Sequence, residues 1–192
     1  MSSLPHPDDT IAALASAPGS GARGIVRVSG PAVVDLLREW FVPAVEQIPA
    51  GNGPSANVRW FERKFASCTS GTLAIAGVSR PVPVDLYLWP NRRSYTGQPL
   101  AELHAPGSPP LLEALLAGLH ARGARPAQPG EFTLRAFLAG RIDLVQAEAV
   151  LGVIDARDRR ELKQALDQLG GGVSSQVVRL RGDLLDLLAD LE

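Results

Sequence analysis

The feature that most constrains the fold of this 192-residue chain is an uneven distribution of glycine and proline. These residues divide the first two-thirds into short apolar runs, whereas the last third is not divided in this way. Short runs between turns are typical of strands and short helices, and long amphipathic stretches are typical of helices. The sequence therefore predicts an α+β fold, with a mixed sheet and packed helices at residues 1–125 and the first helices of an all-α domain at residues 126–192.

Alternation and β-branched residues predict the strands of the first domain. The runs Thr10–Ser16 and Gly24–Ser29 flank a glycine-rich turn and predict a hairpin. Further strands are expected at Thr72–Ile75, Val82–Trp89 and Leu100–His104. Apolar spacing predicts helices at Ala32–Phe41 and Leu111–Arg122, and loops are expected at residues 43–57 and 91–97.

Helical periodicity dominates the second domain. Helices are expected at Phe132–Ala139 and Leu144–Leu169, followed by a break at residues 170–172, which are all glycine. The last segment has apolar residues at alternating spacings of four and three, namely Val173, Val177, Leu180, Leu184, Leu187 and Leu191. Such a seam needs a partner helix, and Leu144–Leu169 is the expected antiparallel partner. Because the chain stops inside this repeat, we expect a fragment or a truncated product.

Composition and charge disfavour several classes of protein. A formal net charge of −1 argues against a dedicated nucleic-acid-binding surface, which needs concentrated basic residues. Of the 19 basic residues, only Lys64 and Lys163 are Lys, and the others are Arg. The simpler explanation of this excess of Arg is the base composition of the genome. The functional explanation is that Arg binds carboxylate or phosphate through two parallel hydrogen bonds. Cys68 is the single cysteine, so no intrachain disulfide is expected. Without a leader or an apolar run of about 20 residues, we expect a cytoplasmic protein with no membrane partner.

Three familiar kinds of site are disfavoured by the residues themselves. Residues 19–24 match the dinucleotide-binding pattern G-x-G-x-x-G, but the last Gly opens a predicted strand and not a helix. The chain contains no P-loop sequence G-x-x-x-x-G-K-[ST], so we expect no GTP hydrolysis by the chain alone. Glu102 and His104 share one strand face, but two candidate ligands do not make a metal site. No catalytic residue is predicted.

Three charged side chains stand in segments that otherwise read as buried. Arg27 interrupts an apolar strand, Glu102 lies within another, and Arg141 stands between two apolar helical segments. For each residue alone, an outward-facing position on a half-buried strand or at a helix end is a sufficient explanation. Together, three such charges would be costly unless a ligand or partner satisfied them. They are therefore the candidate binding residues.

Longer motifs in the chain resemble those of a known family. The longest is residues 129–138 (PGEFTLRAFL), which continues through residues 140–144 (GRIDL) and 146–150 (QAEAV). Residues 9–15 (DTIAALA) and 24–30 (GIVRVSG) form a second block, and residues 94–97 (SYTG) with Glu102-Leu103 form a third. These motifs resemble the tRNA-modification GTPase family called MnmE or TrmE, and the likeness covers nearly the whole chain.

The resemblance implies an N-terminal α+β domain similar to folate-dependent aminomethyltransferase modules, followed by a helical domain that carries an inserted GTP-binding domain. It also implies a homodimer that binds 5-formyltetrahydrofolate through Arg27, Glu102 and Arg141. In the family, the whole protein modifies carbon 5 of the wobble uridine of certain tRNAs, together with a flavoprotein partner of the MnmG type. GTP, Mg²⁺ and potassium belong to the GTP-binding domain, which the resemblance places outside this chain.

The chain also departs from the family pattern. Arg141 stands where relatives usually carry Lys, and residues 106–108 read Pro-Gly-Ser where His-Gly-Gly is usual. In the glycine-rich turn, Ser20 replaces an expected Arg, and Arg23 replaces a small apolar residue. Two alternatives therefore stay open: a dimerisation scaffold that has lost its ligand, and a stand-alone folate-dependent one-carbon transferase. The transferase is disfavoured because no general base stands out and the final helical seam needs more chain.

Overall fold

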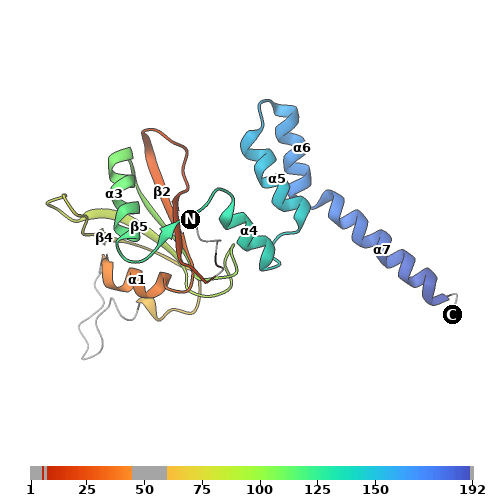
Figure 1. Ribbon diagram of the computed structural model, residues 1–192, viewed down its shortest axis with the longest axis horizontal. Helices are drawn as coiled ribbons and strands as arrows, with labels where there is room; N and C mark the ends of the chain where they lie inside the picture. Colours follow the sequence, from red (N-terminus) through yellow and green to blue (C-terminus); the bar gives the residue numbers. More distant parts are fainter. Residues whose placement is uncertain (1–5, 7, 45–59, 191–192) are drawn as a thin grey trace. The chain divides into compact units, whose positions relative to one another are not determined.

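The chain folds into two compact units, Met1–Phe132 and Thr133–Glu192. A computed structural model describes residues 6, 8–44 and 60–190, and the structural statements below concern these residues. The first unit combines a sheet with helices, and the second is helical (Figure 1). The α+β class predicted from the sequence is therefore confirmed.

The first unit is built on one mixed sheet of seven strands (Figure 1). In spatial order they are β3 (Phe41–Pro43), β4 (Ser67–Leu73), β5 (Val82–Trp89), β6 (Leu100–Gly107), β2 (Gly21–Ser29), β1 (Ile11–Leu14) and β7 (Arg125–Pro126). Neighbours run antiparallel except β1 and β7, which are parallel. The β1–β2 pair is the predicted hairpin, and Gly24 lies within a strand, so residues 19–24 do not open a helix.

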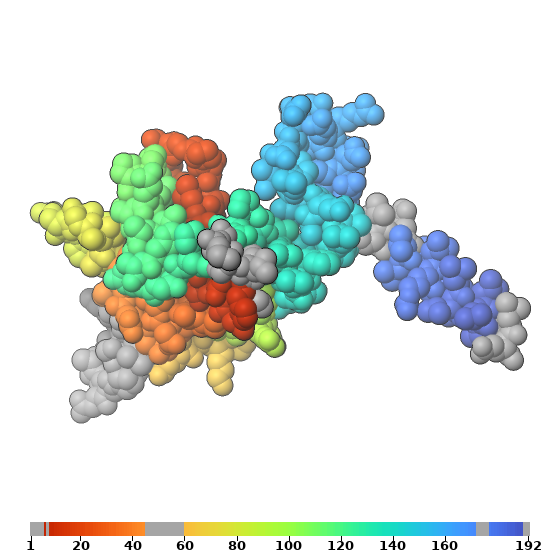
Figure 2. Space-filling model, viewed as in Figure 1, coloured from red at the N-terminus to blue at the C-terminus, as the bar shows by residue number. Residues whose placement is uncertain are grey.

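Two helices cover one face of this sheet, α1 (Val33–Trp40) and α3 (Pro109–His120). Their atoms form one continuous surface, α1 in orange and α3 in green (Figure 2). The side chains beneath them come from alternate strand positions, as the period of two requires, and in β5 they are Val82, Val84, Leu86 and Leu88. Gly24 allows α3 to approach β2, because a Cβ there would lie 2.4 Å from Leu112 Cδ1.

Several strand predictions need correction in their extent. The predicted strand Thr72–Ile75 is β4, which begins five residues earlier, at Ser67, and ends at Leu73. The β6 strand continues three residues past His104 to Gly107, and the short strands β3 and β7 were not predicted. Most of the predicted loop at residues 43–57 lies outside the described residues.

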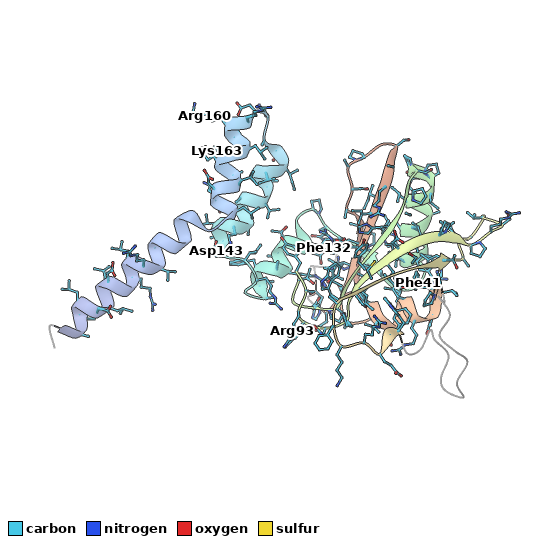
Figure 3. The ribbon with its side chains drawn as sticks, turned by 180° about the vertical axis from the view of Figure 1, so that it is seen from behind. Phe41, Arg93, Phe132, Asp143, Arg160 and Lys163 are labelled. Carbon is cyan, nitrogen blue, oxygen red and sulfur yellow. The ribbon has the colours of Figure 1, made fainter. Side chains whose placement is uncertain are left out.

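The prediction of one long helix over Leu144–Leu169 is wrong. Two helices occupy this segment, α5 (Leu144–Asp155) and α6 (Arg159–Leu169), after the shorter α4 (Glu131–Leu138). The Asp158 carboxylate accepts hydrogen bonds from the backbone N–H groups of Arg160 and Glu161 at 2.7 and 2.8 Å, which starts a new helix. Asp143 begins α5 in the same way, in a capping box with Gln146 (Figure 3).

The expected packing of the apolar seam is also wrong. Helices α5 and α6 form an antiparallel pair of their own, in which the Gln146 side chain at the start of α5 donates to the Leu169 carbonyl at the end of α6. The seam side chains of α7 (Gly172–Asp190) are 57–59% exposed, at Val177, Leu180, Leu184 and Leu187. The seam residues Val173 and Leu191 lie outside the described side chains. None of the described helices is both long enough and apolar enough to cross a membrane.

Candidate functional site

A row of polar side chains crosses the face of the sheet opposite α1 and α3, and we call this face the polar face. The antiparallel register places Arg27 of β2 opposite Glu102 of β6, Glu102 opposite Tyr87 of β5, and Tyr87 opposite Cys68 of β4. Because directly opposed residues point to the same side of a sheet, these side chains are neighbours. The register therefore unites two of the three predicted binding residues.

Arg27 and Glu102 form a close ion pair across β2 and β6. Arg27 Nε donates to Glu102 Oε1 at 2.9 Å, and Arg27 Nη2 lies 2.8 Å from the same oxygen. The Arg27 side chain is 32% exposed and the Glu102 side chain is 17% exposed, so the pair lies at the surface of the polar face but is largely removed from water. The Arg27 guanidinium also stands 5.7 Å from the centre of the Phe132 ring, within the range of a cation–π contact.

His104 holds the other oxygen of the same carboxylate. It follows Glu102 by two residues in β6, and its Nε2 lies 3.1 Å from Glu102 Oε2. The imidazole ring packs on the Tyr87 ring, with centroids 4.4 Å apart, and only 12% of the side chain is exposed. The sequence presents His104 only as a weak candidate for a metal ligand; its spacing from Glu102 predicts a shared strand face but not the contact between them.

The hydrogen bonds around Glu102 favour its ionised form. Burial alone raises the pKa of this carboxyl, but the hydrogen bond from His104 and that from Arg27 outweigh it, so the pKa lies below its ordinary value. A carboxylate has about four lone-pair positions. Arg27 and His104 leave part of this capacity available, and the group can accept hydrogen bonds from a ligand with adjacent N–H donors.

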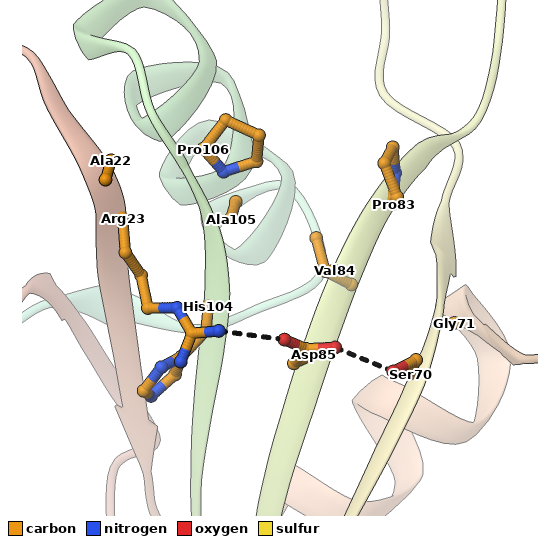
Figure 4. Close-up of a pocket in the computed structure, with 10 residues that line it drawn as sticks. All are labelled: Ala22, Arg23, Ser70, Gly71, Pro83, Val84, Asp85, His104, Ala105 and Pro106. Carbon is orange, nitrogen blue, oxygen red and sulfur yellow. Dashed lines mark hydrogen bonds and ion pairs between the residues drawn. The ribbon is translucent and has the colours of Figure 1, made fainter.

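A second polar row lies beside the first and lines a groove. Arg23 of β2 stands 3.2 Å from Asp85 of β5, and Asp85 also accepts a hydrogen bond of 2.7 Å from Ser70 of β4 (Figure 4). His104 borders this groove as well, and so belongs to both rows. Both Asp85 oxygens therefore have partners within the chain.

The SYTG motif at residues 94–97 fixes the end of β2 that follows Arg27. Thr96 is 1% exposed, and its hydroxyl shares a hydrogen bond of 2.6 Å with Ser29, the last residue of β2. The backbone N–H of Gly30 donates to the Pro99 carbonyl at 3.0 Å. These contacts tie the loop before β6 to the strand that carries Arg27, so the motif supports the site.

Arg125 joins the longest motif to the sheet, which the sequence did not predict. From β7 it donates two parallel hydrogen bonds to Glu131, Nη2 to Oε1 at 2.7 Å and Nη1 to Oε2 at 2.9 Å, and its Nε donates to Asp9 at 2.7 Å. The Glu131 side chain is 2% exposed. These bonds raise the pKa of Arg125 above its ordinary value and lower the pKa of Asp9. Because Phe132 follows Glu131, this cluster also positions the ring that lies 5.7 Å from the Arg27 guanidinium. Figure 3 labels Phe132.

Arg141 lies in the second unit, in the turn between α4 and α5. Its backbone N–H donates to the Ala136 carbonyl at 2.9 Å, and the preceding Gly140 has a φ of +66°, which favours glycine. Arg141 thus belongs to a different unit from Arg27 and Glu102. Its role in ligand binding stays a prediction from the sequence. Within residues 8–44 and 60–190, no three His, Cys, Asp or Glu side chains are grouped as metal ligands would be.

Comparisons with known proteins find relatives along most of the chain. Residues 10–141 match the family described as GTP-binding protein TrmE N-terminus. The chain is 49% identical over 185 residues to the tRNA modification GTPase MnmE of Rhodopirellula baltica, and the match covers 96% of this chain and 37% of that protein. The corresponding proteins of Heliobacterium modesticaldum and Roseiflexus castenholzii are 44% and 41% identical, over 96% and 95% of the chain and 37% and 36% of their own length. The chain thus spans a little over a third of these relatives.

Proposed function

The chain belongs to the family of tRNA modification GTPases, where it matches the N-terminal part, and from that premise we propose that it binds 5-formyltetrahydrofolate and forms a homodimer. The observation that carries the ligand proposal is Glu102, an ionised carboxylate held by Arg27 and His104 on the polar face. The edge of a pterin ring offers adjacent N–H donors, which a carboxylate accepts as a pair. Glu102 is therefore the proposed contact of the pterin.

The arginines are proposed to complete the recognition of this ligand. A folate ends in a glutamate, and a guanidinium binds a carboxylate in a planar, bidentate geometry. Arg27, which also orients Glu102, and Arg141 are the two arginines proposed to contact the ligand. The sequence Pro106-Gly107-Ser108 adjoins this region; here a Cβ on Gly107 would lie 2.5 Å from the Gly21 carbonyl oxygen, so the glycine brings β6 close to β2.

For the whole protein we propose the activity of its relatives, a GTP-dependent modification of carbon 5 of the wobble uridine in tRNA. In this account the GTP-binding domain, with its Mg²⁺ and potassium, lies outside the present chain. The flavoprotein partner of the MnmG type and the tRNA would bind the complete assembly in the cytoplasm. The present chain would contribute ligand binding and dimer formation, without catalysis of its own.

Calorimetric titration of the chain with 5-formyltetrahydrofolate tests the ligand proposal. We expect saturable binding at concentrations up to the high micromolar range, because Arg27 and His104 already hold Glu102 in place before the ligand arrives. Heats no larger than those of ligand dilution over this range would contradict the proposal. They would favour the scaffold alternative, in which the altered residues 106–108 have removed ligand affinity.

Light scattering during size-exclusion chromatography tests the dimer proposal separately. We expect a molar mass twice that of one chain at a protein concentration of tens of micromolar, with or without the folate. A mass equal to one chain throughout this range would contradict homodimerisation, and the calorimetric result would still stand by itself.

A further inference from the structure

His104 is a buried polar side chain whose role extends beyond packing. Its Nε2 lies 3.1 Å from Glu102 Oε2, and a carboxylate only accepts hydrogen bonds, so Nε2 carries the proton and donates. Within the described chain, the other ring nitrogen, Nδ1, is buried and has no hydrogen-bond partner. The contact with Glu102 is therefore the polar interaction that fixes the ring.

The Tyr87 ring limits how His104 can move. The two rings pack with centroids 4.4 Å apart and an angle of 41° between their planes, and the His104 side chain is 12% exposed. A ring held in this way presents its Nε2–H in one direction. By contrast, a long exposed side chain would lose more conformational entropy on adopting a single direction.

Glu102 is consequently held from two sides by different strands. Oε1 accepts from Arg27 of β2, and Oε2 accepts from His104 of β6. With either donor alone, the plane of the carboxylate could turn about its last bond while that hydrogen bond was kept. With both donors in place, one orientation satisfies both, and the remaining lone pairs have fixed directions.

We propose that His104 is a positioning residue for ligand binding, whose Nε2–H fixes the orientation of Glu102 so that its remaining acceptor positions meet paired N–H donors of a pterin-like ligand. This inference rests on the proposed function for the identity of the ligand. The contact within the free protein does not depend on it. Two further titratable groups lie beside His104: Tyr87, on whose ring it packs, and Asp85, which is opposite it in β5 and is paired with Arg23 and Ser70.

The matched variants are His104→Gln and His104→Leu. A Gln amide can donate from nearly the position of Nε2, whereas Leu keeps an apolar side chain against Tyr87 and removes the donor. In each protein the titration of the Glu102 carboxyl carbon is followed by NMR without ligand, with the signal assigned from its loss in Glu102→Gln. We expect a higher Glu102 pKa in His104→Leu than in the wild type, and a wild-type value in His104→Gln, because the hydrogen bond from His104 lowers this pKa.

The same variants are then titrated with 5-formyltetrahydrofolate. We expect His104→Leu to bind about tenfold more weakly than the wild type and His104→Gln to bind within about threefold of it. An unchanged Glu102 titration in His104→Leu, or a His104→Gln variant as impaired as His104→Leu, would overturn the proposal. If the wild type binds no folate, the proposed function fails, and the Glu102 titration still decides whether His104 holds the carboxylate.

Discussion

Replacement of Arg125 by Ala is expected to lower the free energy of unfolding of the first unit by about 3 kcal/mol. The Glu131 carboxylate is 2% exposed and receives two hydrogen bonds from this guanidinium. Removal of one partner from a buried ion pair costs more than the pair contributes when intact, because the remaining charge loses most of its compensation. Glu131 would keep the hydrogen bond from the Gln128 backbone N–H at 2.9 Å. Arg125→Lys should fall between the wild type and Arg125→Ala, because an ammonium cannot form the two parallel bonds.

Urea unfolding followed by tryptophan fluorescence measures this effect, since Trp40, Trp60 and Trp89 all lie in the first unit. Arg38→Ala is the matched control, because Arg38 pairs with Asp35 at 3.2 Å in an exposed position and should change the stability by less than about 0.5 kcal/mol. An equal loss in both variants would show that the Arg125–Glu131 pair has no special role.

The pH dependence of stability gives a second test of the same cluster. The hydrogen bond from Arg125 lowers the pKa of Asp9 in the folded state. A carboxyl with a lowered folded pKa stabilises the protein above its ordinary pKa of about 4, and this stabilisation is lost as the pH falls through the folded value. Arg125→Ala removes the cause of the shift. The stability of that variant should therefore fall less steeply between about pH 4 and pH 2 than that of the wild type.

Replacement of Glu102 by Gln is expected to weaken 5-formyltetrahydrofolate binding about 100-fold, equivalent to about 2.7 kcal/mol. The amide keeps the volume of the carboxylate but replaces one acceptor with a donor, which then faces the donors of the ligand. Hydrogen bonds to a charged group contribute about 1.5–3 kcal/mol each, so the loss of this charge should dominate the affinity. Arg27→Ala should weaken binding about tenfold, because Glu102 loses one of the two partners that orient it.

Asp85→Asn is the control for this measurement. Asp85 lies in the neighbouring groove and pairs with Arg23 and Ser70, so its replacement should leave the affinity within about threefold of the wild-type value. The tryptophan fluorescence of every variant establishes that the first unit is folded. Equal affinities of Glu102→Gln and the wild type would exclude Glu102 as a contact of the ligand.

Local sequence patterns predicted the longer elements of the first unit. Val82–Trp89 alternates apolar and other residues over eight positions and has the same bounds as β5. In β4 the residues before Gly71 are Ser, Cys and Thr, which show no alternation of apolar and polar residues; their place is fixed by pairing with β5. The strands β3 and β7 have three and two residues, too few to show a period, and they exist through partners distant in the sequence.

The errors in the second unit have a different cause. No Gly or Pro separates α5 from α6, so the helical period continued across the break. The signal that was missed is Asp158 with Glu161 three residues later, a pattern typical of a helix start. Once the segment folds back on itself, it no longer provides one continuous face for the seam of α7.

The sequence predicted two residues of the polar row, and it did not predict how they contact each other. Charges within apolar runs identified Arg27 and Glu102, which then proved to be partners in an ion pair. Their contact depends on the register between β2 and β6, and a shift of one residue would send their side chains to opposite faces. His104 contacts Glu102 within β6, two residues further along the same face, and Phe132 is held near Arg27 by the attachment of Glu131 to Arg125.

The location of bound folate on the polar face tests the central claim most directly. Isotope-filtered NOE spectra of the labelled chain with unlabelled 5-formyltetrahydrofolate would report which side chains lie within a few ångströms of the ligand. Binding through Glu102 predicts NOEs from the pterin protons to the rings of Tyr87 and His104, the nearest neighbours of this carboxylate on β5 and β6. A saturated complex whose NOEs involve only residues away from these strands would contradict the account.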